Sequence, residues 1–174
     1  MLFIFLAGCQ ANAVDINRAP AYTTVKPGSQ LVLNKPLTIP ANKARVYLQS
    51  GNIVHENSVD QYSPNCSLEV RTIHPSPQQI HADTFRIMKI SWDEESSYSK
   101  RIYASSQLIT GRHLSSDGPS YENFVTHFYL HSARQPDVFR LSCAHWEDPA
   151  DFNPRHLSIS EIQIAAGDYF SFKN

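Results

Sequence analysis

The sequence predicts a mainly β protein, built as a single antiparallel sandwich or barrel-like domain with a short C-terminal helix. Short runs rich in β-branched and aromatic residues recur between residues 30 and 145, and Pro, Gly and Asn turn signals separate them. Helix-capping residues appear instead near the C-terminus. The 174 residues, 41% of them hydrophobic, suffice for one domain with a sizeable core and are too few to expect two.

The expected strands are bounded by residues that interrupt strand pairing. Prolines and asparagines break the chain after the first two runs, Ser50-Gly51-Asn52 after the third, and Pro75 and Pro77 after the fourth. Residues 93–99 are acidic and Ser-rich and predict a loop. Residues 132–136 have the length of a hairpin connection. The expected strands cover residues 30–33, 37–39, 44–49, 66–73, 84–92, 101–109, 122–131 and 137–145.

The C-terminal segment carries the signals of a helix. Ser158 and Glu161 fit a capping box, in which each side chain satisfies the other residue's backbone N–H. Gly167 stands where a helix often ends in a left-handed residue. The apolar residues over 162–166 also alternate as in a strand, but the capping signals favour a short helix.

The N-terminus suggests export. The first eight residues are apolar, and Leu6-Ala7-Gly8-Cys9 resembles the lipobox of bacterial lipoproteins. The resemblance implies that residues 1–8 are the remnant of a signal peptide and that the Cys9 thiol carries lipid. Gln10, where inner-membrane lipoproteins often have Asp, favours the outer membrane. The alternative is a short buried strand of a cytoplasmic protein, and no other run approaches the ~18 apolar residues of a membrane span.

Three domain segments follow from this interpretation. Residues 1–8 are the signal remnant, residues 9–27 form a lipidated tether with little apolar periodicity, and residues 28–174 form the β-rich domain. The stretches IPANKARVYLQSG and YSPNCSLEV are similar to segments of exported proteobacterial proteins to which no activity is attached. This resemblance implies an exported domain and says nothing of mechanism.

The two remaining cysteines predict a disulfide. In each strand-like run the cysteine, Cys66 or Cys143, shares its face with apolar residues two and four positions away, so both thiols point towards the core. With Cys9 assigned to lipid they form an even pair in an oxidising compartment. The alternative is two separate buried thiols.

Composition and motifs exclude several functions. The net charge is −1 and 18% of residues are charged, so nothing favours nucleic acid as a partner. The sequence contains no P-loop or G-x-G-x-x-G for phosphate groups, and no G-x-S-x-G for a catalytic serine. We therefore expect no cofactor, and a binding module rather than an enzyme.

Histidines offer the alternative. His127 and His131 are four residues apart and share one face of the expected strand. His145, or Glu147 and Asp148 after it, would complete a metal site if the two neighbouring strands pair. A solvated, hydrogen-bonded sheet face is the competing interpretation.

Aromatic residues near the expected loops are further candidates for a binding surface. Tyr98, Tyr103, Tyr121 and Trp146 would line a binding surface or cap the ends of the core. Together these observations predict a lipid-anchored protein of the bacterial cell envelope that binds an envelope protein or a glycan. The alternative is a metal-binding protein or hydrolase that uses the surface histidines.

Overall fold

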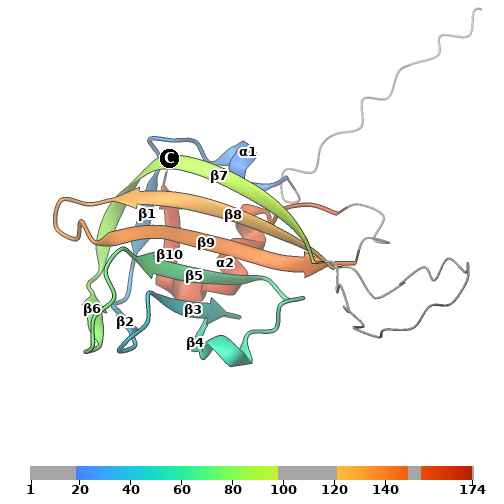
Figure 1. Cartoon of the computed structure of the whole chain (residues 1–174). Helices are drawn as coiled ribbons and strands as arrows, with labels where there is room; N and C mark the ends of the chain where they lie inside the picture. The colour runs from blue at the N-terminus through green and yellow to red at the C-terminus, as the bar shows by residue number, and fades with distance from the viewer. Residues whose placement is uncertain (1–18, 98–120, 149–153, 174) are drawn as a thin grey trace, which may run out of the picture.

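The computed structural model describes residues 19–97, 121–148 and 154–173, which form a curled antiparallel sheet with a helix against its inner face (Figure 1). The strands are short where turn residues interrupt them, and they are long where no turn residue interrupts the alternation of side chains between the two faces. The described elements are α1 (Ala21–Thr24), β1 (Gln30–Leu33), β2 (Leu37–Ile39), β3 (Arg45–Gln49), β4 (Asn52–Val54), β5 (Asn65–Val70), β6 (Gln78–Ile80), β7 (Asp83–Ser97), β8 (Tyr121–His131), β9 (Val138–Glu147), α2 (Ile159–Ala166) and β10 (Phe170–Lys173), with 3-10 turns at Glu56–Ser58 and Gly167–Tyr169.

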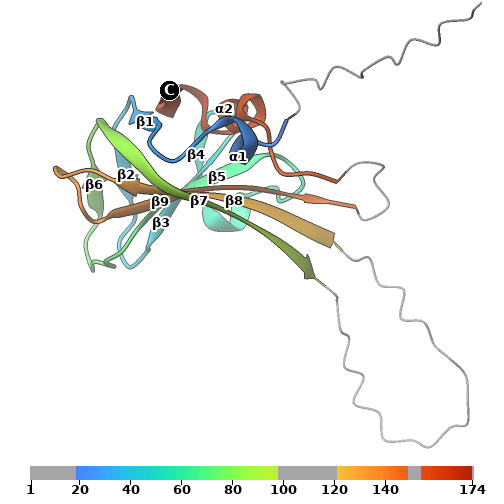
Figure 2. The ribbon, with the colours of Figure 1, turned by 90° about the horizontal axis from the view of Figure 1, so that it is seen from above.

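The main sheet contains eight strands in the order β10-β1-β7-β8-β9-β5-β3-β4, and β2 pairs separately with β6. All neighbouring strands in the described part of the chain run antiparallel. The sheet curls so that β1 and β10 lie behind β7 and β8, with α2 on the same side (Figures 1 and 2). The mainly β prediction is therefore confirmed, and its barrel-like form is a half-barrel closed by a short C-terminal helix.

Alternation along the strands separates two faces, which we call inner and outer. On the inner face, Leu48, Cys66, Phe128 and Leu141 are fully buried in one hydrophobic core, to which α2 contributes the fully buried Ile162. The outer face carries the intervening polar residues of the same strands. Burial of these apolar side chains, each worth roughly 1.5–3 kcal/mol, is what holds the helix against the sheet.

The predicted disulfide is present in the inner face. Cys66 of β5 and Cys143 of β9 lie directly opposite each other in the register of the two strands, with their Cα atoms 4.0 Å apart. Both residues are fully buried. The bond crosslinks two adjacent central strands and closes a sequence separation of 77 residues.

The predicted helix is also present with its capping box. The Ser158 hydroxyl accepts a hydrogen bond from the Glu161 N–H, and Glu161 accepts one from the Ser158 N–H at 2.8 Å. Arg155 donates two further hydrogen bonds to the same carboxylate, at 2.8 and 2.7 Å. Hydrogen bonds from Arg155 and Ser158 lower the pKa of Glu161 to about 2 despite its partial burial. The helix start therefore keeps its acidic cap ionised over the physiological range.

The chain joins the domain earlier than expected. The predicted tether includes residues 19–27, but Ala21 and Val25 are buried in the core and the Ala21 N–H donates to the Leu157 carbonyl at 2.8 Å. Apolar side chains four residues apart fit one turn of helix, which allows α1 to dock against the segment preceding α2. Residues 1–18, with the expected signal remnant and Cys9, lie outside the described residues.

Several strands of the structure are absent from the sequence-based prediction or are longer than predicted. β4, β6 and β10 are too short to stand out in the sequence and exist through pairing with β3, β2 and β1. Residues 93–97, expected in a loop, extend β7 because β8 pairs with them along their length. The expected strand over 101–109 lies outside the described residues. None of the helices in the described ranges is long and apolar enough to cross a membrane.

Candidate functional site

A polar groove of about 410 Å³ lies on the outer face, across five adjacent strands. Because successive side chains of a strand point to opposite faces, the strands that bury the disulfide also present polar residues here. We call this feature the outer-face groove. Its lining residues are Arg45, Tyr47, Gln61, Asn65, Ser67, Asp93, Glu95, Asn123, Val125, His127, Arg140, Ser142 and Ala144.

A β-bulge in β7 decides which of its residues reach the groove. Ile87 pairs with Leu130 and Lys89 pairs with Tyr129, so Met88 is an extra residue in the ladder. The bulge reverses the facing of the rest of the strand. Asp93 therefore points outward, beside β8, instead of inward.

Three side chains from three neighbouring strands form a continuous hydrogen-bonded chain in the groove. His127 of β8 lies between Ser142 of β9 and Asp93 of β7. Its Nδ1 is 2.8 Å from Ser142 Oγ, and its Nε2 is 3.1 Å from Asp93 Oδ2. A carboxylate accepts only, so Asp93 favours the tautomer with the proton on Nε2. Nδ1 is then free to accept the Ser142 hydroxyl.

The environment keeps this imidazole neutral. The side chain of His127 is 11% exposed, whereas that of Asp93 is 58% exposed. Burial, together with the charge of Arg140, lowers the pKa of His127 below its ordinary value, although Asp93 acts in the opposite direction. At neutral pH the histidine is therefore a base that can still take up a proton.

Two arginines flank a partly buried carboxylate, that of Glu69, at one side of the groove. Arg140 Nε donates to Glu69 at 2.7 Å, and Arg45 approaches the other Glu69 oxygen at 3.4 Å. In the lining itself, these two guanidinium groups are balanced by Asp93 and Glu95. The groove thus offers many hydrogen-bond donors and acceptors without a strong net charge.

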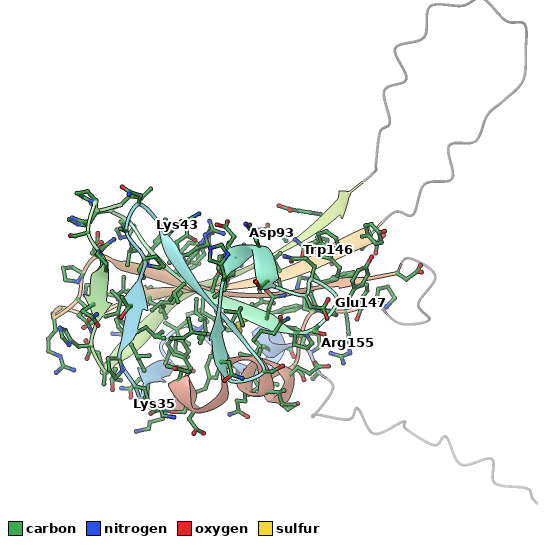
Figure 3. The ribbon with its side chains drawn as sticks, turned by 90° about the horizontal axis from the view of Figure 1, so that it is seen from below. Lys35, Lys43, Asp93, Trp146, Glu147 and Arg155 are labelled. Atoms are coloured by element: carbon green, nitrogen blue, oxygen red, sulfur yellow. A yellow bond between two sulfur atoms is a disulfide. The ribbon has the colours of Figure 1, made fainter. Side chains whose placement is uncertain are left out.

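An aromatic cluster closes the opposite end. Tyr121 and Trp146 lie two residues beyond Asn123 and Ala144 of the groove lining and stack with ring centroids 5.3 Å apart. Tyr62 packs edge-on against Trp146 at 5.8 Å and is 52% exposed. Figure 3 shows Asp93 and Trp146 away from the helix side of the sheet, where Arg155 lies.

A buried glutamine holds the loop that carries the exposed tyrosine. Gln49 of β3 donates from Nε2 to the Asp60 carbonyl at 2.8 Å and accepts from the Asp60 N–H at 3.0 Å. The Trp146 N–H donates to the Gln61 carbonyl at 2.7 Å. These bonds fix Tyr62 relative to the groove. A hydrogen bond with Tyr121 raises the pKa of Tyr62 to about 12, so its hydroxyl remains protonated.

The expected metal ligands do not meet. His127 lies on the outer face, whereas His145 pairs with Phe124 on the inner face and its Nε2 is 2.7 Å from Glu147. His131 is exposed at the end of β8. The residues that the structure describes contain no group of three or more His, Cys, Asp or Glu arranged to hold a metal ion. The proposed His127, His131 and His145 set is therefore wrong as a single site, because His145 has the same facing as Cys143.

Sequence reasoning found some of the groove residues and missed others. His127, Tyr121 and Trp146 were singled out, and the structure places all three on the outer face. Ser142 and Asp93 were missed, although alternation with Cys143 already places Ser142 away from the core. Tyr98 and Tyr103 lie outside the described residues.

The fold and site define the protein by its architecture as a disulfide-bonded antiparallel half-barrel with a polar groove on its outer face. No known protein family, curated protein or solved structure matches the chain. The chemistry of the groove is therefore derived from its own side chains.

Proposed function

We propose that the protein is a lipid-anchored domain of the bacterial cell envelope whose outer-face groove binds a neutral glycan. The observation that carries this proposal is the lining of the groove: amides, hydroxyls, balanced charges and a neutral imidazole, beside an aromatic cluster. A glycan presents many hydroxyl groups that both donate and accept hydrogen bonds. Such a lining matches those groups without requiring a charged ligand.

Individual lining groups remain suited to an added ligand. Asn123 Oδ1 is buried and receives no hydrogen bond from the described residues, so it retains the capacity to accept one. Asn65 uses Nδ2 to donate to the Ser63 carbonyl at 3.1 Å, which fixes the orientation of this amide in the lining. Preset polar groups lower the ordering cost of binding.

The aromatic cluster supports a sugar rather than a protein partner. The exposed ring of Tyr62 stands at the end of the groove, and the C–H face of a pyranose packs on such a ring while its hydroxyls reach the polar lining. The fully buried core of a protein–protein interface is more apolar than the rest of the protein surface. The described exposed large apolar residues, such as Ile73, Met88 and Ile164, do not line the groove.

Glycan binding is tested with two groove variants. Ala144→Trp fills the groove with an indole from a strand position, and Tyr62→Ala removes the exposed ring. We expect binding to a neutral oligosaccharide array, and to insoluble cell-wall glycan, to weaken at least about tenfold in each variant. Titration calorimetry on the strongest array ligand gives the dissociation constants.

The matched control is Ile164→Ala, which truncates a side chain 66% exposed on α2, the helix that lies on the inner face of the sheet (Figure 2). This variant should bind like the unmodified protein. The proposal is overturned if no oligosaccharide binds, or if binding is unaffected by Ala144→Trp. Exclusive binding of a purified envelope protein would replace the glycan by that partner.

The anchor is tested separately by mass. We expect protein recovered from native outer membranes to begin at Cys9, to carry acyl chains there, and to gain two hydrogens on reduction of its disulfide. Several acyl chains at about 0.8 kcal/mol per buried CH₂ hold such a protein firmly at a bilayer. An unacylated chain that retains residues 1–8 would contradict the anchor while leaving the glycan proposal standing.

A further inference from the structure

We propose that Ser142, His127 and Asp93 hydrolyse small carboxylic esters in the outer-face groove, with Ser142 as nucleophile, His127 as general base and Asp93 as the positioning carboxylate. The substrate class we infer is an O-acylated sugar, and this part rests on the proposed glycan function. The hydrogen-bonded chain of these three residues does not depend on the glycan proposal, because it is given by the distances between their side chains. Ser142 stands in neither a G-x-S-x-G nor an S-x-x-K motif, so strand register is what brings the three residues together.

The hydrogen-bonded chain contains the three groups that a catalytic serine requires: the nucleophile, a base beside it and a carboxylate that positions the base. A serine hydroxyl is a weak nucleophile unless an adjacent base accepts its proton, and that base in turn needs a fixed tautomer. His127 Nδ1 lies 2.8 Å from Ser142 Oγ, within reach for proton transfer, and Asp93 lies 3.1 Å from Nε2. The carboxylate both holds the ring and stabilises the imidazolium formed during the reaction.

The groove beside Ser142 has room for a small acyl group. Val125 and Ala144 are paired across β8 and β9, next to the pair His127 and Ser142. They are the apolar aliphatic side chains among the described lining residues. Their small size suits an acetyl-sized methyl group, while the hydroxylated part of the ligand extends over the polar lining.

Hydrogen-bond donors flank the nucleophile for the developing oxyanion. Ser67 of β5 lies directly opposite Ser142 in register, and Arg140 lies two residues away on the same face. Arg140 is held through its Nε by Glu69 at 2.7 Å, and its terminal amino groups carry further donors. Preorganised donors of this kind stabilise the charge that appears on the carbonyl oxygen.

The reaction balances with water as the co-reactant. Ser142 Oγ forms a bond to the ester carbonyl carbon as its proton passes to His127 Nδ1. The carbon–oxygen bond to the sugar then breaks, and the sugar hydroxyl takes that proton. Water next attacks the acyl-serine, gives a proton to His127, and releases the carboxylic acid as Ser142 recovers its own. The net change is ester plus water to acid plus alcohol.

The experiment uses a fluorophosphonate probe and p-nitrophenyl acetate. The probe forms an Oγ–P bond at an activated serine as the P–F bond breaks and fluoride leaves. We expect one adduct, located by peptide mapping on Ser142, and a release of nitrophenolate that falls about 100-fold or more in Ser142→Ala and His127→Ala. Asp93→Asn should lower the labelling rate at saturating probe while leaving half-saturation unchanged.

The matched control is Ser91→Ala, which removes a hydroxyl of β7 opposite His127 that does not line the groove. It should label and hydrolyse like the unmodified protein. The proposal is overturned if Ser142 gains no adduct, or if hydrolysis is the same in folded Ser142→Ala. Glycan binding by Ser142→Ala separates the two proposals, since loss of hydrolysis with retained binding leaves the proposed function intact.

Discussion

Replacing both Cys66 and Cys143 with alanine is expected to lower the free energy of unfolding by about 4 kcal/mol. The disulfide spans 77 residues, and crosslinking a loop of that length removes conformational entropy from the unfolded chain. The two cysteines are also fully buried, so the loss of their sulfur atoms leaves a cavity in the core. Urea unfolding followed by circular dichroism measures the change.

The reduced, unmodified protein is the control for this experiment. It keeps both sulfur atoms in the core but loses the crosslink, so its unfolding midpoint should fall nearly as far as that of the double variant. A reduced protein as stable as the oxidised one would contradict the stabilising role of the bond. Because both cysteines are fully buried, native protein should also resist mild reductant longer than unfolded protein.

Gly167→Ala is expected to destabilise the fold by about 3 kcal/mol or more. Gly167 ends α2 with φ +56° and ψ −141°, a conformation that side chains disfavour. A Cβ at this position would also lie 2.5 Å from the Cα of Gly51. The three nearest atoms, Cα, O and C of Gly51, all belong to the backbone, so the turn after β3 and the end of α2 would have to move apart. Thermal and urea unfolding measure the loss.

The variant Gly28→Ala distinguishes the cost of the positive φ angle from the cost of the steric clash between Gly167 and Gly51. Gly28 has φ +102°, yet an added Cβ there would have no neighbour within 4 Å. This variant should therefore lose only the conformational cost, about 1–3 kcal/mol. Equal losses in the two variants would show that the approach of Gly167 to Gly51 contributes nothing to stability.

The two ends of α2 show which features can be predicted from residues that are close together in the sequence. The capping box of Ser158 and Glu161 depends on residues three apart, and Gly167 depends on its own backbone angle, so the sequence predicts both ends of the helix. The facing of Cys66 and Cys143 is local in the same way. Alternation also places His145 on the core side with Cys143, so the same rule argues against the expected three-histidine site.

The docking of α1 shows where local patterns fail. Residues 20–27 contain prolines and little periodicity, and they are ordered only because Ala21 and Val25 find the surface beside Leu157. β10 similarly becomes a strand by pairing with β1, which lies 137 or more residues earlier in the chain. Such elements gain their stability from a distant partner, which a local window does not contain.

By itself, the sequence determined the β-rich class, the inward facing of the two cysteines and the capped C-terminal helix, because each depends on residues close together in the chain. Only the tertiary structure decided the groove. The bulge at Met88 turns Asp93 outward, and the pairing of β8 with β9 sets Ser142 beside His127. Register and bulges depend on how several strands pack at once, which is why the hydrogen-bonded chain in the groove was not visible before the fold.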